Sequence, residues 1–230
     1  MKYSDFTVII PTFNESENIS ELLKVLNKLY PGISIIVSDD GSTDGTQKIV
    51  LDIGMEKVVL LDRSAKPVHG LTASVMDAVL MANTKYIVVI DGDMQHPPEK
   101  IKSFASKLEE GCAVVVGSRA KVLVPWPIQR RMISWVATKL GSVRLRLSGA
   151  YTKDVLSGFF GAKRDLFAEK VTNYSSKFEP RGYKVLFDFL KLLPRKTKVA
   201  EVPYEFGLRT KGESKIKMKH VLLFLRSMLK

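Results

Sequence analysis

Residues 86–99 read YIVVIDGDMQHPPE, and the polarity of this stretch changes abruptly at Asp91. The five residues before Asp91 are aromatic or branched aliphatic, which is typical of a buried strand. Two carboxylates, Asp91 and Asp93, therefore follow a predicted strand, with the amide oxygen of Gln95 close behind. Carboxylates one residue apart on an extended chain lie roughly 6–7 Å apart, so one hard cation can draw both together. We expect Asp91, Asp93 and Gln95 to hold Mg²⁺ or Mn²⁺ with positions open for phosphate oxygens.

Strands and helices alternate on both sides of this stretch. Short apolar runs that end in polar residues predict further strands at 6–10, 33–37, 58–61, 113–116 and 198–206. Apolar residues at helical spacing predict helices at 19–29, 43–52, 71–83, 101–108, 164–171 and 183–193. This alternation indicates the α/β class, with a mostly parallel, twisted sheet and flanking helices.

Polar residues follow three of the predicted strands, at 13–15, 38–40 and 91–95. Ligands of open parallel sheets bind beyond the carboxyl ends of the strands, so we expect these three loops to meet in one crevice. A turn without a ligand is the alternative for Asp-Gly-Asp alone, and three such loops together disfavour it. No GxGxxG motif follows the first strand, which argues against a dinucleotide site.

The length of 230 residues is ordinary for a single α/β domain, which we expect to span 1–230. Cys112 is the only cysteine, so the chain can form no internal disulfide and a reducing compartment is expected. The sequence has neither a signal-peptide pattern nor an apolar run near 18 residues. We therefore expect that the chain as given does not span a membrane.

The net charge of +12 is concentrated in two segments, 119–147 and 209–230, which carry +7 and +6. The first segment has no acidic residue and contains both tryptophans, Trp126 and Trp135. Basic residues mixed with Trp and aliphatic residues are typical of a helix that lies in a membrane surface. A core helix with a solvated basic face is the alternative. A nucleic-acid partner is disfavoured, because we find no stacking platform or recognition motif.

Three motifs resemble those of the family-two inverting glycosyltransferases with the nucleotide-sugar A-type fold. They are PTFNE at 11–15, DDGSTDG at 39–45 and DGDMQHPP at 91–98. Later stretches are similar to the polyprenyl-phosphate branch of that family, which includes the dolichyl-phosphate mannose synthases. These stretches are 117–119, 130–134, 157–159, 201–203 and 212–215.

The resemblance implies a role for each group of candidate residues. The nucleotide site would be lined by Pro11, Phe13, Glu15 and Asp40. The cation on the diphosphate would be held by Asp91, Asp93 and Gln95, and Arg209 with Lys215 would close over the donor. The lipid phosphate would be received by Arg119, Arg130 and Ser134, which makes 119–147 the acceptor and membrane-interface segment. The segment 209–230 would form a C-terminal loop and an amphipathic helix.

The activity implied by the resemblance is metal-dependent transfer of mannose from GDP-mannose to dolichyl or other polyprenyl phosphate, with inversion. Asp91, Asp93 and Arg119 would be its catalytic residues. A lipid phosphate is already mostly ionised at neutral pH, so no general base is needed, and none of the three histidines has a triad-like setting. A glucosyltransferase that uses UDP-glucose is the alternative, and a catalytically silent membrane scaffold is a more distant one.

The resemblance also implies a peripheral location on the cytoplasmic face of a membrane. Relatives are anchored either by transmembrane helices after the catalytic domain or by a membrane partner, and both arrangements remain open here. The chain departs from the family at two places. Phe160 stands where Arg commonly follows Ser-Gly-Phe, and the stretch 69–72 reads HGLT with one glycine fewer than is usual.

Overall fold

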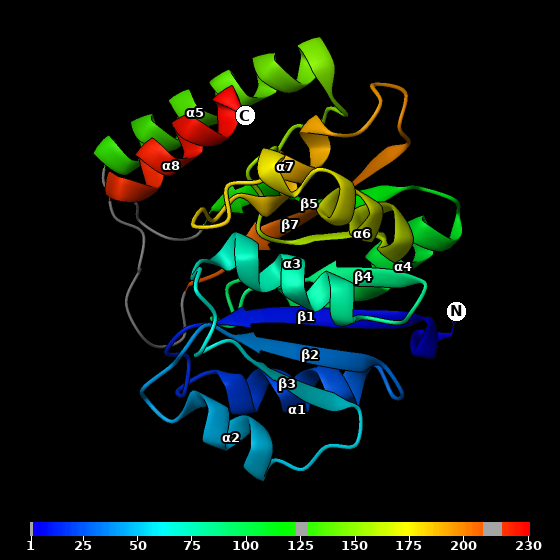
Figure 1. Cartoon of the computed structure of the whole chain (residues 1–230). Helices are drawn as coiled ribbons and strands as arrows, with labels where there is room; N and C mark the ends of the chain where they lie inside the picture. The colour runs from blue at the N-terminus through cyan, green and yellow to red at the C-terminus, as the bar shows by residue number, and fades with distance from the viewer. Residues whose placement is uncertain (1, 123–127, 209–217) are drawn as a thin grey trace.

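The computed structural model describes residues 2–122, 128–208 and 218–230. In this part of the chain a seven-stranded sheet carries helices on both faces (Figure 1). The strands are β1 (Phe6–Thr12), β2 (Ser34–Asp39), β3 (Val58–Asp62), β4 (Tyr86–Val89), β5 (Val114–Val122), β6 (Phe160–Lys163) and β7 (Val199–Phe206). The helices are α1 (Ile19–Leu29), α2 (Thr46–Asp52), α3 (Leu71–Met81), α4 (Ile101–Glu109), α5 (Ile128–Ser148), α6 (Arg164–Asn173), α7 (Val185–Lys191) and α8 (Met218–Leu229). Short 3-10 turns are η1 (Tyr3–Asp5), η2 (Pro98–Lys100) and η3 (Ser175–Lys177).

The strands lie in the order β3-β2-β1-β4-β6-β5-β7. Strands β1 to β4 pair in parallel, as do β5 and β7, and β6 runs antiparallel to its neighbours β4 and β5. The predicted mostly parallel sheet is therefore confirmed. The strand β6 was not predicted, because its four residues FGAK have neither the length nor the composition of a typical strand.

The sheet separates two apolar cores. Side chains alternate along a strand, so in β1 Val8 and Ile10 point to one core and Ile9 points to the other. The core of Val8 is covered by α1 and α4, and the core of Ile9 by α3, α6 and α7 with single residues from α5 and α8. Burial on both faces explains why the central strands are almost continuously apolar.

Several elements differ from the predicted boundaries, and three of these differences have a clear physical reason. Strand β1 continues through Pro11 to Thr12, because proline removes only one backbone donor and its fixed φ suits an extended chain. Strand β5 continues past Val116 to Val122, with a register shift between Arg119 and Lys121, so Arg119 belongs to a strand rather than to a loop. Helix α2 begins at Thr46, since the Asp44 carboxylate accepts the Thr46 amide and holds a turn before the helix.

Helices α5 and α8 lie side by side at the edge of the fold (Figure 1). Phe224 of α8 packs against Gly141 of α5, and Arg144 donates a hydrogen bond to the carbonyl of Met228. Within the described ranges, no helix combines the length and the apolar character that crossing a bilayer requires.

The hydroxyl of Tyr30 ties the end of α1 to the turn that follows residues 91–97. It donates to the carbonyl of Pro98 at 2.7 Å and accepts the amide of Lys102 at 3.3 Å. Tyr30→Phe leaves both backbone groups without this partner, and we expect it to lower the free energy of unfolding by about 1–2 kcal/mol. Urea unfolding measures the change. Tyr174→Phe, at an exposed tyrosine, is the control and should change nothing, and equal effects of the two variants would contradict the prediction.

Candidate active site

The loops after β1, β2 and β4 meet at one edge of the sheet, as the sequence predicts for parallel strands. The amide of Asp40 donates to the carbonyl of Thr12, and the amide of Ile90 donates to that of Ile9. The amide of Asn14 donates to the hydroxyl of Ser42 at 2.7 Å, which joins the first two loops. Gly92 lies beside Glu15, since an added Cβ would be in ordinary van der Waals contact with the Glu15 Cγ at 3.5 Å, and this contact joins the first loop to the third.

Asp39 holds the first two loops together. Its carboxylate is fully buried and accepts hydrogen bonds from Thr12 Oγ1 at 2.7 Å, Gln47 Nε2 at 2.8 Å, and both the amide and the hydroxyl of Ser42 at 2.8 and 2.6 Å. Four donors compensate the loss of hydration of one carboxylate. The sequence analysis singled out Asp40 and gave Asp39 no role of its own.

The carboxylate of Asp40 anchors the loop that precedes α3. It accepts the amide of Gly70 at 2.7 Å, lies 3.2 Å from His69 Nδ1 and forms an ion pair with the buried Arg63. Burial raises the pKa of Asp40, and the Arg63 guanidinium opposes that shift. Arg63 was missed by the sequence analysis. It also bonds Asp77 at 3.0 Å, so this cation fastens β3 to α3.

The residues predicted to hold a metal occupy the loop after β4. Asp91 has a side chain that is 32% exposed, and Asp93 is buried with its Oδ1 accepting the amide of Gln95 at 3.1 Å. The side-chain Nε2 of Gln95 donates to the carbonyl of Gly207 at 3.0 Å, which joins this loop to the end of β7. Within the described ranges, no three His, Cys, Asp or Glu side chains cluster as a metal site. Two carboxylates and one amide oxygen nevertheless suit a hard cation that shares its coordination sphere with phosphate oxygens.

The Asp91 carboxylate packs directly on the backbone of Gly158. A Cβ added to Gly158 would lie 2.9 Å from Asp91 Oδ2, so no other residue fits without moving the carboxylate. His96 supports the same loop from beneath: it stacks on Phe159 at 5.2 Å and its Nδ1 accepts the amide of Asp91 at 3.3 Å. Burial lowers the pKa of His96 to about 4, so this ring is neutral at pH 7 and acts as part of the core.

Arg119 is held by a partner that the sequence analysis missed. Its Nε and Nη2 each lie 2.7 Å from an oxygen of Asp154, and its amide donates to the same carboxylate at 3.2 Å. The guanidinium also lies over the ring of Phe206, 6.0 Å from the centroid. Burial would raise the pKa of Asp154, but the hydrogen bonds from Arg119 outweigh it and the pKa is lowered. The only signal in the sequence was the position of Asp154 three residues before Ser157-Gly-Phe159.

The other predicted site residues are placed unevenly. Pro11 is buried within β1, and Phe13 is half exposed just after it. Arg130 and Ser134 belong to α5, but their side chains lie outside the described part of the structure. Arg209 and Lys215, expected to close over the donor, also lie outside the described residues.

The chain resembles known proteins in sequence and in fold. The profile of Glycosyl transferase family 2 matches residues 7–170. A dolichol-phosphate mannosyltransferase of Pyrococcus furiosus is 34% identical over 225 residues, which cover 96% of this chain and 61% of that protein, so the chain spans less than two thirds of this relative. The Saccharomyces cerevisiae protein of the same name is 31% identical over 97% of this chain and 85% of its own length. A solved glucosyl-3-phosphoglycerate synthase of Mycobacterium tuberculosis shares the fold, with a TM-score of 0.68 at 21% identity over 97% of this chain and 78% of that one.

Asp154→Asn tests the pairing with Arg119. At pH 7 we expect it to lower the free energy of unfolding by about 3 kcal/mol, because a largely buried guanidinium loses its charged partner. A carboxyl with a lowered pKa stabilises the fold above its unfolded pKa of about 3.9, and that stabilisation is lost as the pH falls through the folded pKa. The difference in stability between the parent and the variant, measured by thermal unfolding, should therefore become smaller below about pH 4. Asp165→Asn, at an exposed ion pair, is the control, and a gap independent of pH would contradict the assignment.

Proposed function

This chain belongs to glycosyl transferase family 2, and we propose that it transfers mannose from GDP-mannose to dolichyl or another polyprenyl phosphate with inversion. The observation that carries the proposal is the meeting of three polar loops at one edge of the sheet, with Asp91 and Asp93 among them. The names of the relatives support the sugar and the acceptor.

The residues after β4 would bind a divalent cation on the donor. The neighbouring glucosyl-3-phosphoglycerate synthase was solved in complex with Mn²⁺ and UDP-glucose, which supports a cation of this kind. When bound, Mg²⁺ or Mn²⁺ would supply Lewis-acid stabilisation of the departing diphosphate. Asp91, Asp93 and Gln95 would hold it, and the contact with Gly158 would keep the Asp91 carboxylate in place.

The remaining candidate residues would bind and orient the two substrates. The nucleotide would lie against Phe13, Glu15 and Asp40, and Arg63 and Gly70 hold the Asp40 carboxylate in place. The acceptor phosphate would be received by Arg119, Arg130 and Ser134. Asp154 takes two of the donor groups of Arg119, so we assign Asp154 the role of orienting that guanidinium.

A peripheral membrane location fits the surface formed by α5 and α8. Aliphatic residues at helical spacing are exposed along α5, namely Val136, Leu140, Val143 and Leu147. The neighbouring α8 exposes three more, namely Leu222, Leu225 and Leu229. Arg144 and Arg146 on α5 would face anionic headgroups. Trp126 and the side chain of Trp135, predicted to anchor this surface, lie outside what the structure describes.

Transfer itself is tested with labelled GDP-mannose, polyprenyl phosphate and Mn²⁺ or Mg²⁺. We expect label in the organic phase, and Asp91→Asn or Asp93→Asn should abolish it without unfolding the protein, because loss of one charge weakens the cation site. Asp52→Asn makes the same charge change on the surface of α2 and should leave transfer unchanged. If the label is transferred from UDP-glucose but not from GDP-mannose, the donor is UDP-glucose and the proposed mannosyl donor is wrong. Unchanged transfer by both site variants at low metal concentration would contradict the metal assignment.

Membrane binding is tested with anionic liposomes and the double variant Val143→Ser, Leu147→Ser. Each aliphatic side chain removed from water contributes about 1.5–3 kcal/mol when fully buried, so we expect binding to weaken at least about tenfold. Binding by the parent should also weaken as salt rises, since the basic residues act through screened charges. Leu51→Ser is the control, because Leu51 is 65% exposed on α2, a helix at the opposite end of the fold from α5 and α8 (Figure 1). Equal pelleting of the double variant and the parent would exclude α5 as the membrane surface.

A further inference from the structure

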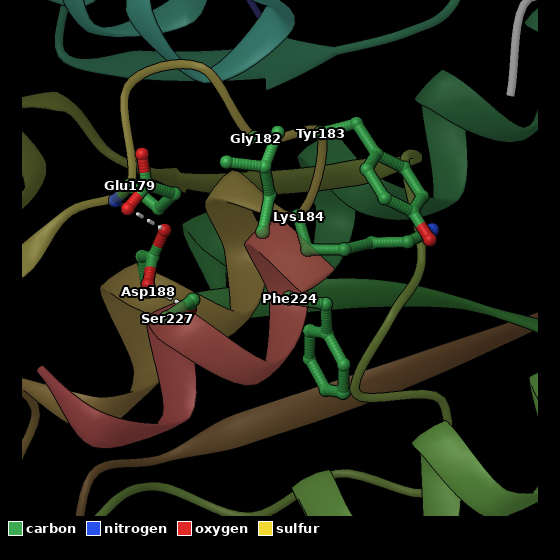
Figure 2. A pocket seen from close by; sticks show the side chains of 8 residues that line it. Glu179, Gly182, Tyr183, Lys184, Asp188, Phe224 and Ser227 are labelled. Carbon is green, nitrogen blue, oxygen red and sulfur yellow. Dashed lines mark hydrogen bonds between the residues drawn. The ribbon is translucent and has the colours of Figure 1, made fainter. Parts of the chain in front are cut away.

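A buried ion pair on α7 forms hydrogen bonds to Ser227 of α8. Asp188 and Lys191 lie one turn apart, 2.8 Å from each other, and both side chains are almost fully excluded from solvent. The hydroxyl of Ser227 on α8 donates to Asp188 Oδ1 at 2.5 Å. The ammonium of Lys191 donates to the Ser227 carbonyl at 2.5 Å and to the Lys177 carbonyl at 3.3 Å. Figure 2 shows Asp188 between Ser227 and Glu179.

The second oxygen of Asp188 fixes the loop before α7. It accepts the amide of Glu179 at 3.0 Å. The buried carboxylate of Glu179 pairs with Arg226 of α8 at 3.2 Å and with Lys230, the residue after α8, at 3.1 Å. Lys230 also donates to the carbonyl of Phe178 at 2.6 Å. The start of the segment 179–184 is thus attached to α8 by several independent polar contacts.

The segment 179–184 also forms hydrogen bonds with the first turn of α3. The carbonyl of Pro180 accepts the amide of Ala73, and that of Gly182 accepts the amide of Thr72, both at 3.1 Å. Amides in the first turn of a helix have no acceptor within the helix, so this segment supplies it. Gly70 packs so tightly here that an added Cβ would lie 2.5 Å from the Pro180 carbonyl oxygen. The amide of Gly70 is the group that donates to Asp40 in the candidate site.

The end of the segment reaches the other side of the site. The ammonium of Lys184 donates to the carbonyl of Leu156 at 2.7 Å. Leu156 lies between Asp154, which orients Arg119, and Gly158, which supports the Asp91 carboxylate. Residues 179–184 therefore contact Gly70, which donates to Asp40, and Leu156, which lies two residues before Gly158 in the chain.

We propose that α8 is a positioning element for the nucleotide-sugar site, and that Asp188 transmits its position through residues 179–184 to the supports of Asp40 and Asp91. This inference rests on the proposed function for the identity of the site. Asp188 is a positioning residue, because both of its oxygens are occupied by donors from the protein. A buried ion pair contributes little to stability compared with apolar packing, but it requires a defined geometry of its neighbours. A contact with such strict geometry is suited to hold α8 in the position that the nucleotide-sugar site requires.

The test combines amide hydrogen exchange with donor kinetics in Ser227→Ala and Asp188→Asn. Loss of one buried hydrogen bond should raise the exchange rates of Thr72 and Ala73 roughly five- to tenfold. The KM for the sugar nucleotide should rise by a similar factor. Thr7→Val is the matched control, since it removes a buried hydroxyl hydrogen bond to Thr84 at 2.7 Å far from this network. It should change neither the exchange at residues 72–73 nor the donor KM.

The outcomes separate this inference from the proposed function. A parent that transfers no sugar contradicts the proposed function, whereas exchange at residues 72–73 still decides whether α8 positions α3. An active parent whose Ser227→Ala variant keeps both the exchange rates and the donor KM overturns the inference. Equal changes in Thr7→Val also overturn it, because they would reflect a general loss of stability. Ser227→Ala decides alone if Asp188→Asn does not fold.

Discussion

The candidate site depends on the hydrogen bonds that the Asp39 carboxylate accepts. It is fully buried at the end of β2, and donors from β1, from the loop after β2 and from α2 surround it. A buried carboxylate is costly without such donors, so the loops are held in the one arrangement that supplies all of them. Phe13, Glu15 and Asp40 lie beside these hydrogen bonds, which fix the positions of their loops. Asp39, to which we assign no ligand, therefore fixes the arrangement of the loops at the candidate site.

Three ionic contacts extend the same principle across the fold. Arg63 with Asp40 and Arg119 with Asp154 join residues that are 23 and 35 positions apart in the chain. Lys191 and Asp188 lie one turn apart on α7, and together they bind Ser227 of α8. In each contact the charges are largely shielded from solvent, so separating the partners leaves an uncompensated ion. The basic residues of this chain thus serve two purposes. Some lock the supports of the site, and others, such as Arg146 beside the exposed leucines of α5, remain on the surface.

Much of the architecture could be predicted from the sequence, because helical and strand periodicities are local. The alternation of strands and helices, the parallel pairing around β1 and the meeting of the loops after β1, β2 and β4 are confirmed. Strand β6 was missed since its pairing with β4 and β5, and not its composition, makes it a strand. The extension of β5 to Val122 has the same origin in its pairing with β7. The roles of Arg130, Ser134, Arg209 and Lys215 stay predictions.

The class of fold, the edge of the sheet at which the polar loops meet and the motifs of the family could all be read from the amino-acid order. Polarity switches and spacings are properties of neighbouring residues, and they survive without knowledge of the fold. Only the tertiary structure decided which charged groups pair. Asp154 and Arg119 are separated by 35 residues, and Ser227 and Asp188 by 39. Such partners are selected by the packing of whole helices and strands against the sheet, and no local pattern in the chain encodes that choice.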